Sequence, residues 1–171
     1  NDDVRADQNN VAFGSFLLTP VAEDLDIDSM VFTLTKGAAA DVCLEDLRLR
    51  DVNGNGSYTL EAVVACSTGQ TTSTYQVEDL VLSQGVDYEF ELLADVASTA
   101  DADDAYTWSW SASNVTGEGV QSDNTITSDD FSSAALTGPT MTVAASSLTI
   151  RSSALTDDTV VNGTDDVLMF R

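Results

Sequence analysis

The alternation of polar and apolar residues predicts an all-β protein built as an antiparallel β-sandwich. Apolar residues recur at every second position along about ten short segments. Clusters rich in Gly, Asn, Ser and Pro separate these segments, and no segment shows the spacing of an amphipathic helix. Short strands in this arrangement are typical of two antiparallel sheets packed face to face.

The individual strands follow from the same alternation. Along residues 25–35, apolar residues alternate with acids and threonines, and a break at Asp28 and Ser29 predicts a β-bulge. Along residues 86–96, Tyr88 and Phe90 face one way while the acidic residues between them face the other. The expected strands cover residues 11–19, 25–35, 42–51, 57–66, 73–83, 86–96, 106–115, 119–127, 141–151 and 159–170.

Composition excludes several classes of function. The chain has 171 residues with 29 acidic and 6 basic side chains, a net charge of −23 and no histidine. Binding to nucleic acid or to an anionic membrane needs clustered Lys and Arg, which are missing here. Without histidine, neither a His-based catalytic triad nor a His-ligated zinc site is possible. We therefore expect that the protein is not an enzyme and that its function is structural, or lies in binding or assembly.

Two cysteines predict a disulfide bond. The segment Asn53-Gly54-Asn55-Gly56 is a strong hairpin-turn signal. A two-residue loop of Gly54 and Asn55 places Cys43 opposite Cys66 in the two flanking strands. The same register places Arg48 opposite Glu61 and Arg50 opposite Thr59 on the polar face. A Cys43–Cys66 bond persists in an oxidising compartment and so favours export, whereas two buried free thiols remain the alternative.

Calcium is the one cofactor for which the sequence contains candidate ligands, although no cofactor is required. Asp51, Asn53 and Asn55 have the spacing of ligands in an EF-hand-type loop, but position twelve is Ala62 and the hairpin turn explains the same residues. A second candidate is the acidic group Asp101, Asp103 and Asp104, for which simple solvation is the ordinary explanation. If the chain is extracellular, three sequons are candidates for glycosylation, at Asn55, Asn114 and Asn162.

Tyr106, Trp108 and Trp110 share one face of an expected strand, with Thr and Ser on the other face. A flat aromatic row of this kind can stack sugars, which would indicate a carbohydrate-binding module. Because the opposite face is polar, however, the aromatic face is the one expected in the core.

The two ends of the chain resemble each other. Residues 9–14 match residues 165–170 at an offset of 156, either by coincidence or because a second repeat begins near residue 156. We expect a sandwich domain over residues 1–155 and a terminal strand over residues 156–171. That strand has no place in its own sheet, so we expect it to engage a neighbouring subunit or module. Its side chains expected to select the docking groove are Val160, Val167 and Met169.

Four segments carry a resemblance to a known group of proteins. They are FGSFLLT at 13–19, EDLDI at 23–27, VFTL at 31–34 and YEFELLADV at 88–96. These segments resemble Ig-like β-modules of tandem-repeat bacterial and archaeal cell-surface proteins. The resemblance implies a component of a surface layer, stalk or fibre, with a sandwich of Ig-like or jelly-roll type.

These observations predict an extracellular structural subunit of a filament or cell-surface array, assembled from copies of itself by β-strand addition. The alternative is an adhesin module of a longer surface protein that binds glycans or a protein partner. The high content of Asp, with few Lys, looks like that of secreted proteins from salty habitats. We therefore expect stability or assembly to need high ionic strength or Ca²⁺, which screens or bridges the negative charge.

Overall fold

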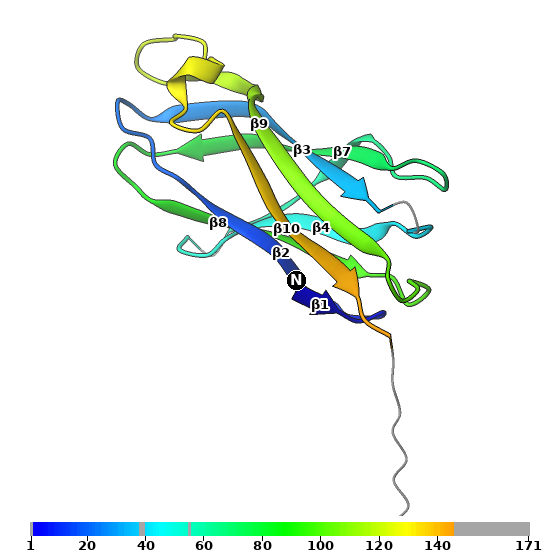
Figure 1. The fold of residues 1–171 in the computed structure, drawn as a ribbon. Coiled ribbons are helices and arrows are strands. Elements are labelled where there is room, and N and C mark those ends of the chain that lie inside the picture. Colours follow the sequence, from blue (N-terminus) through cyan, green and yellow to red (C-terminus); the bar gives the residue numbers. More distant parts are fainter. Residues whose placement is uncertain (1, 38–39, 55, 146–171) are drawn as a thin grey trace, which may run out of the picture.

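Two β-sheets pack face to face in the computed structural model, which describes residues 2–37, 40–54 and 56–145 (Figure 1). The predicted all-β sandwich is confirmed. One turn of 3₁₀ helix, Ser128–Asp130, precedes the last strand. The strands are β1 Asp2–Val4, β2 Val11–Leu18, β3 Leu25–Lys36, β4 Leu44–Asp51, β5 Ser57–Thr59, β6 Glu61–Val64, β7 Thr72–Leu82, β8 Tyr88–Val96, β9 Ala105–Gly119 and β10 Ala135–Val143.

The larger sheet has the order β1-β10-β9-β3-β7-β6, and the smaller has the order β2-β8-β4-β5. Neighbouring strands are antiparallel except for β1, which runs parallel to the end of β10 with Val4 beside Val143. Along one side of the sandwich, β2 of the smaller sheet runs beside β10 of the larger one (Figure 1).

The core lies between the sheets and is filled by the apolar side of each alternating strand. Along β3, Met30, Phe32 and Leu34 point inward, and each is almost completely buried. The aromatic row on β9 is also buried, so the interpretation of these residues as core is confirmed. Burial of each large apolar side chain contributes about 1.5–3 kcal/mol to the free energy of unfolding. The bulge predicted at Asp28 and Ser29 is present, as a register shift against β9.

Three predicted strands are wrong in detail. The expected strand over residues 57–66 is two strands in different sheets, because the chain crosses between the sheets at the buried Leu60. Residues 120–127 form a loop rather than a strand, with an isolated bridge between Glu118 and Thr125. The last described strand begins at Ala135 rather than Met141, because a bulge lets it continue through Gly138 and Pro139. The predicted strand over residues 159–170 lies outside the described residues.

Candidate functional site

The disulfide bond joins Cys43, just before β4, to Cys66, just after β6, and the two Cα atoms are 5.9 Å apart. The predicted pairing of the cysteines is therefore confirmed. The bond does not link two neighbours of one hairpin, as the sequence predicted. It joins the smaller sheet to the larger one, because β4 and β6 belong to different sheets.

The predicted hairpin register is wrong by two residues. Arg48 pairs with Thr59 rather than Glu61, and Arg50 pairs with Ser57 rather than Thr59. The physical reason is a wider turn, in which the Asp51 amide donates to the Gly56 carbonyl at 2.9 Å. Both arginines instead form ion pairs with acidic residues of β8: Arg48 with Asp95 and Arg50 with Glu91.

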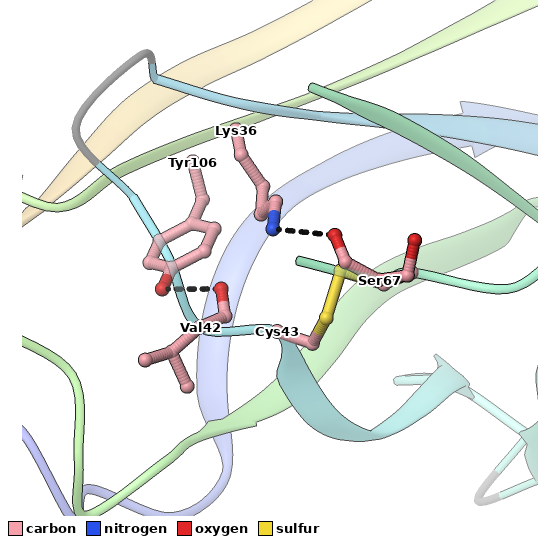
Figure 2. The surroundings of a disulfide bond; sticks show 6 residues. Lys36, Val42, Cys43, Ser67 and Tyr106 are labelled. Carbon is pink, nitrogen blue, oxygen red and sulfur yellow. Dashed lines mark hydrogen bonds between the residues drawn. A yellow bond between two sulfur atoms is a disulfide. The ribbon is translucent and has the colours of Figure 1, made fainter. Parts of the chain in front are cut away.

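Two buried polar side chains donate hydrogen bonds to the backbone carbonyls of residues next to the two cysteines (Figure 2). The ammonium group of Lys36, which is only 3% exposed, donates to the Ser67 carbonyl at 3.3 Å. The hydroxyl of Tyr106 donates to the Val42 carbonyl at 3.1 Å. Burial, together with the nearby charge of Asp104, raises the pKa of Tyr106 to about 12. These two hydrogen bonds therefore stabilise the fold around the disulfide.

In both calcium candidates, one carboxylate accepts hydrogen bonds from backbone N–H groups of a local turn. The Asp51 carboxylate accepts the backbone N–H groups of Asn53 and Gly54 at 3.0 and 2.9 Å, as in an Asx turn. The buried Asp104 carboxylate accepts the backbone N–H of Asp101 at 3.0 Å. Among the described residues, no three His, Cys, Asp or Glu side chains are grouped as metal ligands. Calcium binding stays a prediction.

The remaining candidate residues are only partly within the described ranges. Asn114 is exposed on β9, where a glycan could be attached. Asn55 and Asn162 lie outside the described residues, as do the assembly residues Val160, Val167 and Met169. Within the described ranges, no helix is long and apolar enough to cross a membrane.

One sheet edge differs from the others. The edge strands β1, β5 and β6 have three, three and four residues, whereas β2 has eight and carries no charged side chain. In the part of the chain that the structure describes, no strand pairs with the outer edge of β2 or with residues 135–140 on the outer side of β10. Long, uncharged free edges present unpaired backbone N–H and C=O groups, which favour pairing with another strand.

An apolar groove lies between these two free edges. Its first part is a cavity of about 320 Å³, lined by residues 14–18 of β2, residues 131–133, residues 136–139 and the two tryptophans. None of these lining residues is charged, although one residue in five of the whole chain is. A second cavity of about 450 Å³ shares Leu17, Leu18, Phe131 and Ser132 with the first and continues towards residues 19–25, with the charged Glu23 and Asp130 in its lining. Together the two cavities form what we call the β2–β10 groove.

The Trp108 indole closes the floor of the groove. Its N–H donates to the Phe13 carbonyl of β2 at 2.7 Å, and the side chain is only 2% exposed. Gly14 on β2 and Gly138 on β10 flank the ring, and a Cβ atom at either glycine would overlap the indole. Gly14 also has a φ of 152°, which L side chains rarely adopt. Both glycines are therefore required for the close approach of the two strands to the ring.

Trp110 also lines the groove, but its polar atom has no partner. The side chain is 6% exposed and packs edge-to-face against Phe131, with ring centroids 5.4 Å apart. Its indole N–H is buried and makes no hydrogen bond within the described residues. An unpaired buried donor costs about 1–3 kcal/mol.

The rim of the groove combines exposed apolar side chains with two carboxylates, both of which accept hydrogen bonds from neighbouring residues. Leu17 and Val21 are 61% and 83% exposed. The Glu23 carboxylate accepts hydrogen bonds from the Ser122 hydroxyl and from the backbone N–H groups of Gln121 and Ser122, which lower the pKa of Glu23. The Asp130 carboxylate accepts from the backbone and hydroxyl of Thr127, with the same effect on the pKa of Asp130. The Glu23 carboxylate is thus held by the loop that follows β9, and the Asp130 carboxylate by the turn that begins at Thr127.

Comparisons with models of protein families, with curated proteins and with solved structures found no match. The function must therefore be argued from the residues of the groove. Sequence reasoning missed Phe131, Leu136 and Gly138 as groove residues. One signal was available: Phe16, Leu17 and Leu18 break the alternation of β2 and leave Leu17 facing outward.

Proposed function

We propose that this chain is a structural subunit of an extracellular filament or cell-surface array, in which copies assemble by β-strand addition. The observation that carries the proposal is the first cavity of the β2–β10 groove, which has no charged residue in its lining and lies between two free strand edges. In such a groove, backbone hydrogen bonds supply affinity and alternate side chains supply specificity. The donor strand is the terminal segment 156–171 of a neighbouring copy.

The distribution of charge supports this choice of surface. A net charge of −23 makes copies of the chain repel one another. The first cavity of the groove has no carboxylate in its lining, so a strand docked there meets no acidic side chain from that lining. The disulfide is compatible with an extracellular location, where such bonds persist.

The test is the oligomeric state of the purified chain with and without residues 156–171. The truncation removes none of the ten described strands, so the sandwich is kept. Light scattering coupled to gel filtration, over a range of concentrations and in high salt, should show polymers of the full chain and monomers of the truncated one. A full chain that stays monomeric at the highest concentration would contradict the proposal.

The second candidate is an adhesin module that binds a protein partner. The exposed Leu17 and Val21 at the rim favour a protein over a sugar, because Trp108 and Trp110 are too buried to form a stacking platform. Full and truncated chains that are both monomeric, but that bind a surface protein through this rim, would favour the adhesin. Glycan-array binding that is lost in Trp108→Ala or Trp110→Ala would favour the carbohydrate-binding form of this candidate.

A further inference from the structure

The backbone hydrogen bonds of β8 show which way the backbone groups of β2 point. Along a strand, the N–H and C=O groups of one residue point to one side, and those of the next residue point to the other. The Glu89 carbonyl accepts the Val52 amide at 2.8 Å on the side of β4, whereas the Val96 amide donates to the Gln8 carbonyl at 2.9 Å on the side of β2. The bulges in these two ladders lie on β2 and β4, so the alternation along β8 is unbroken. Even-numbered residues of β8 therefore face β2.

This alternation leaves backbone groups of β2 free at its outer edge. Residues 14–18 pair with β8 without a register shift, and Phe16 lies opposite Phe90, so Phe16 bonds to β8. The N–H and C=O groups of its neighbours Ser15 and Leu17 therefore point away from β8. Both residues are exposed, and within the described residues no strand lies beyond them. Four backbone groups are thus available to an incoming strand.

The free part of β10 is the poorer acceptor. Its pairing with β9 is interrupted by a bulge at Gly138 and Pro139. Pro139 has no N–H group, and bulges and prolines are features with which edge strands avoid pairing. Beyond the bulge, residues 141–143 are already covered by β1. The regular part of this edge is therefore residues 135–137, which is shorter than the stretch in β2.

We propose that the terminal segment of a second copy adds to β2, and not to β10, as a fifth strand of the smaller sheet that runs parallel to β2. This inference rests on the proposed function and names the acceptor strand. The incoming backbone bonds to Ser15 and Leu17, and its inward side chains fill the first cavity of the groove. Pairing ends at Gly14, because the Trp108 indole already donates to the Phe13 carbonyl at 2.7 Å.

The donor stretch within this segment is residues 167–170. Residues 14–18 of β2 span about 17 Å at ~3.4 Å per residue, which matches a donor stretch of four or five residues. The run Val167-Leu168-Met169-Phe170 is entirely apolar and suits a cavity without charge in its lining. The other uncharged run, residues 159–164, contains Asn162, Gly163 and two threonines, and is the poorer match.

The charges at the two ends of this run favour the parallel direction. Two aspartates at 165–166 precede the run, and Arg171 follows it. The second cavity lies at the C-terminal end of β2 and has the carboxylates of Glu23 and Asp130 in its lining, with no basic residue. A parallel strand brings Arg171 to these carboxylates, whereas an antiparallel strand brings the two aspartates to them. Because exposed ion pairs contribute little affinity, this pair selects the direction of the strand.

Proline substitutions at the two free edges test which strand accepts the donor. The Ala112 amide donates to the Ala134 carbonyl, so even-numbered residues before the bulge face β9 and the Thr137 amide points outward. Ser15→Pro and Thr137→Pro therefore each remove one outward N–H group and keep the internal ladders. In light scattering of the full chain, Ser15→Pro should stop assembly, whereas Thr137→Pro should assemble as the wild type does. Circular dichroism and the melting temperature check that both variants keep the sandwich.

A titration measures the same difference as an affinity. A fluorescently labelled peptide of residues 156–171 is added to the dilute full chain, and binding is followed by anisotropy. The affinity should fall at least about fivefold for Ser15→Pro and stay unchanged for Thr137→Pro. In the peptide, Met169→Asp should abolish binding, because it places a charge in the donor stretch. Val160→Asp is the matched control and should leave binding intact.

Hydrogen exchange gives a readout that needs no variant of the chain. In the dilute full chain, the amides of Ser15 and Leu17 should exchange rapidly and the amide of Phe16 slowly. A saturating concentration of the peptide should slow the exchange of Ser15 and Leu17 at least about fivefold and leave that of Thr137 unchanged. If Ser15→Pro fails to fold, this measurement on the unmodified chain decides.

A nitroxide label tests the direction of the strand. The label is carried on a cysteine added to the peptide after Arg171. It should broaden the amide signals of Thr19 and Val21, at the C-terminal end of β2, more than those of Val11 and Ala12. The opposite pattern would overturn the parallel direction.

The possible failures are distinguishable. If Thr137→Pro stops assembly or the Thr137 amide is the one protected, β10 accepts the strand and the inference is overturned, while the proposed function stands. If both proline variants or neither stop assembly, the assignment to β2 alone is overturned. If the amides of Ser15 and Leu17 already exchange slowly in the dilute full chain, its own tail covers β2 and the second copy is overturned. If the peptide does not bind and the full chain stays monomeric, the proposed function fails as well.

Discussion

Replacing both cysteines by serine, Cys43→Ser with Cys66→Ser, removes the covalent link between the two sheets. The bond spans 23 residues of sequence, and the loop contains β4, β5 and β6. Opening a loop of this length restores chain entropy to the unfolded state that is worth about 3.4 kcal/mol at 25 °C. We expect the free energy of unfolding to fall by about that amount.

Thermal and urea unfolding of the oxidised wild type and the double variant measure this loss. At about 2–4 °C per kcal/mol for a chain of this size, the melting temperature should fall by roughly 7–14 °C. Ser67→Ala is the control, because it keeps the disulfide and the Ser67 carbonyl that accepts from Lys36. The wild type in reducing agent should match the double variant.

Hydrogen exchange distinguishes a link between sheets from a link within one hairpin. All four side chains of the edge strand β6 are exposed, so little apolar burial holds it in place. Without the bond, the amides of β6 should exchange faster by a larger factor than those of β5. A loss of less than about 1 kcal/mol, or equal acceleration in both strands, would refute the account of the bond as an inter-sheet link.

Four further predictions concern the groove and the charge. Leu17→Lys should leave stability within about 0.5 kcal/mol and abolish assembly in light scattering, whereas the equally exposed control Val63→Lys on β6 should assemble normally. Gly138→Ala should lower stability by about 1–3 kcal/mol in urea unfolding, because the added methyl overlaps the Trp108 indole; no loss would mean that the ring has room to move. Because the pKa of Tyr106 is raised, the hydroxyl loses its proton near pH 10 in the unfolded chain but only near pH 12 in the folded chain. The free energy of unfolding of the wild type should therefore exceed that of Tyr106→Phe by its full amount below pH 10, and this difference should shrink between pH 10 and 12. The melting temperature should rise with NaCl or CaCl₂ and fall with EDTA added to the calcium-containing sample, and independence from all three would contradict the charge argument.

The sequence predicted the features that depend on periodicity. The fold class, the bulge in β3 and the burial of the β9 aromatics all follow from which residues alternate. The pairing of Cys43 with Cys66 was also predicted, although from a register that is wrong by two residues. Composition could not reveal that the Asp51 carboxylate would organise a wider turn by accepting two backbone N–H groups.

The groove was harder to predict because it depends on relations between sheets. A single buried residue, Leu60, moves the chain from one sheet to the other, and periodicity within a strand carries no trace of such a crossing. Gly and Pro are typical of turns, whereas Gly138 and Pro139 lie within β10, and Gly138 leaves the space that the Trp108 indole needs. The unpaired N–H of Trp110 is likewise visible only once its neighbours are placed.

The proposed assembly through the uncharged first cavity of the groove has a kinetic consequence. Two copies that approach each other carry −23 each, so their encounter is slowed by repulsion that salt screens. In the proposed docked state, the contacts would be backbone hydrogen bonds and apolar side chains in the first cavity, whose lining is uncharged, and salt has little effect on such contacts. Ionic strength should therefore change the rate of association far more than the rate of dissociation. A subunit whose charge slows association but has little effect on dissociation can stay assembled when the salt concentration falls, while free copies stay apart.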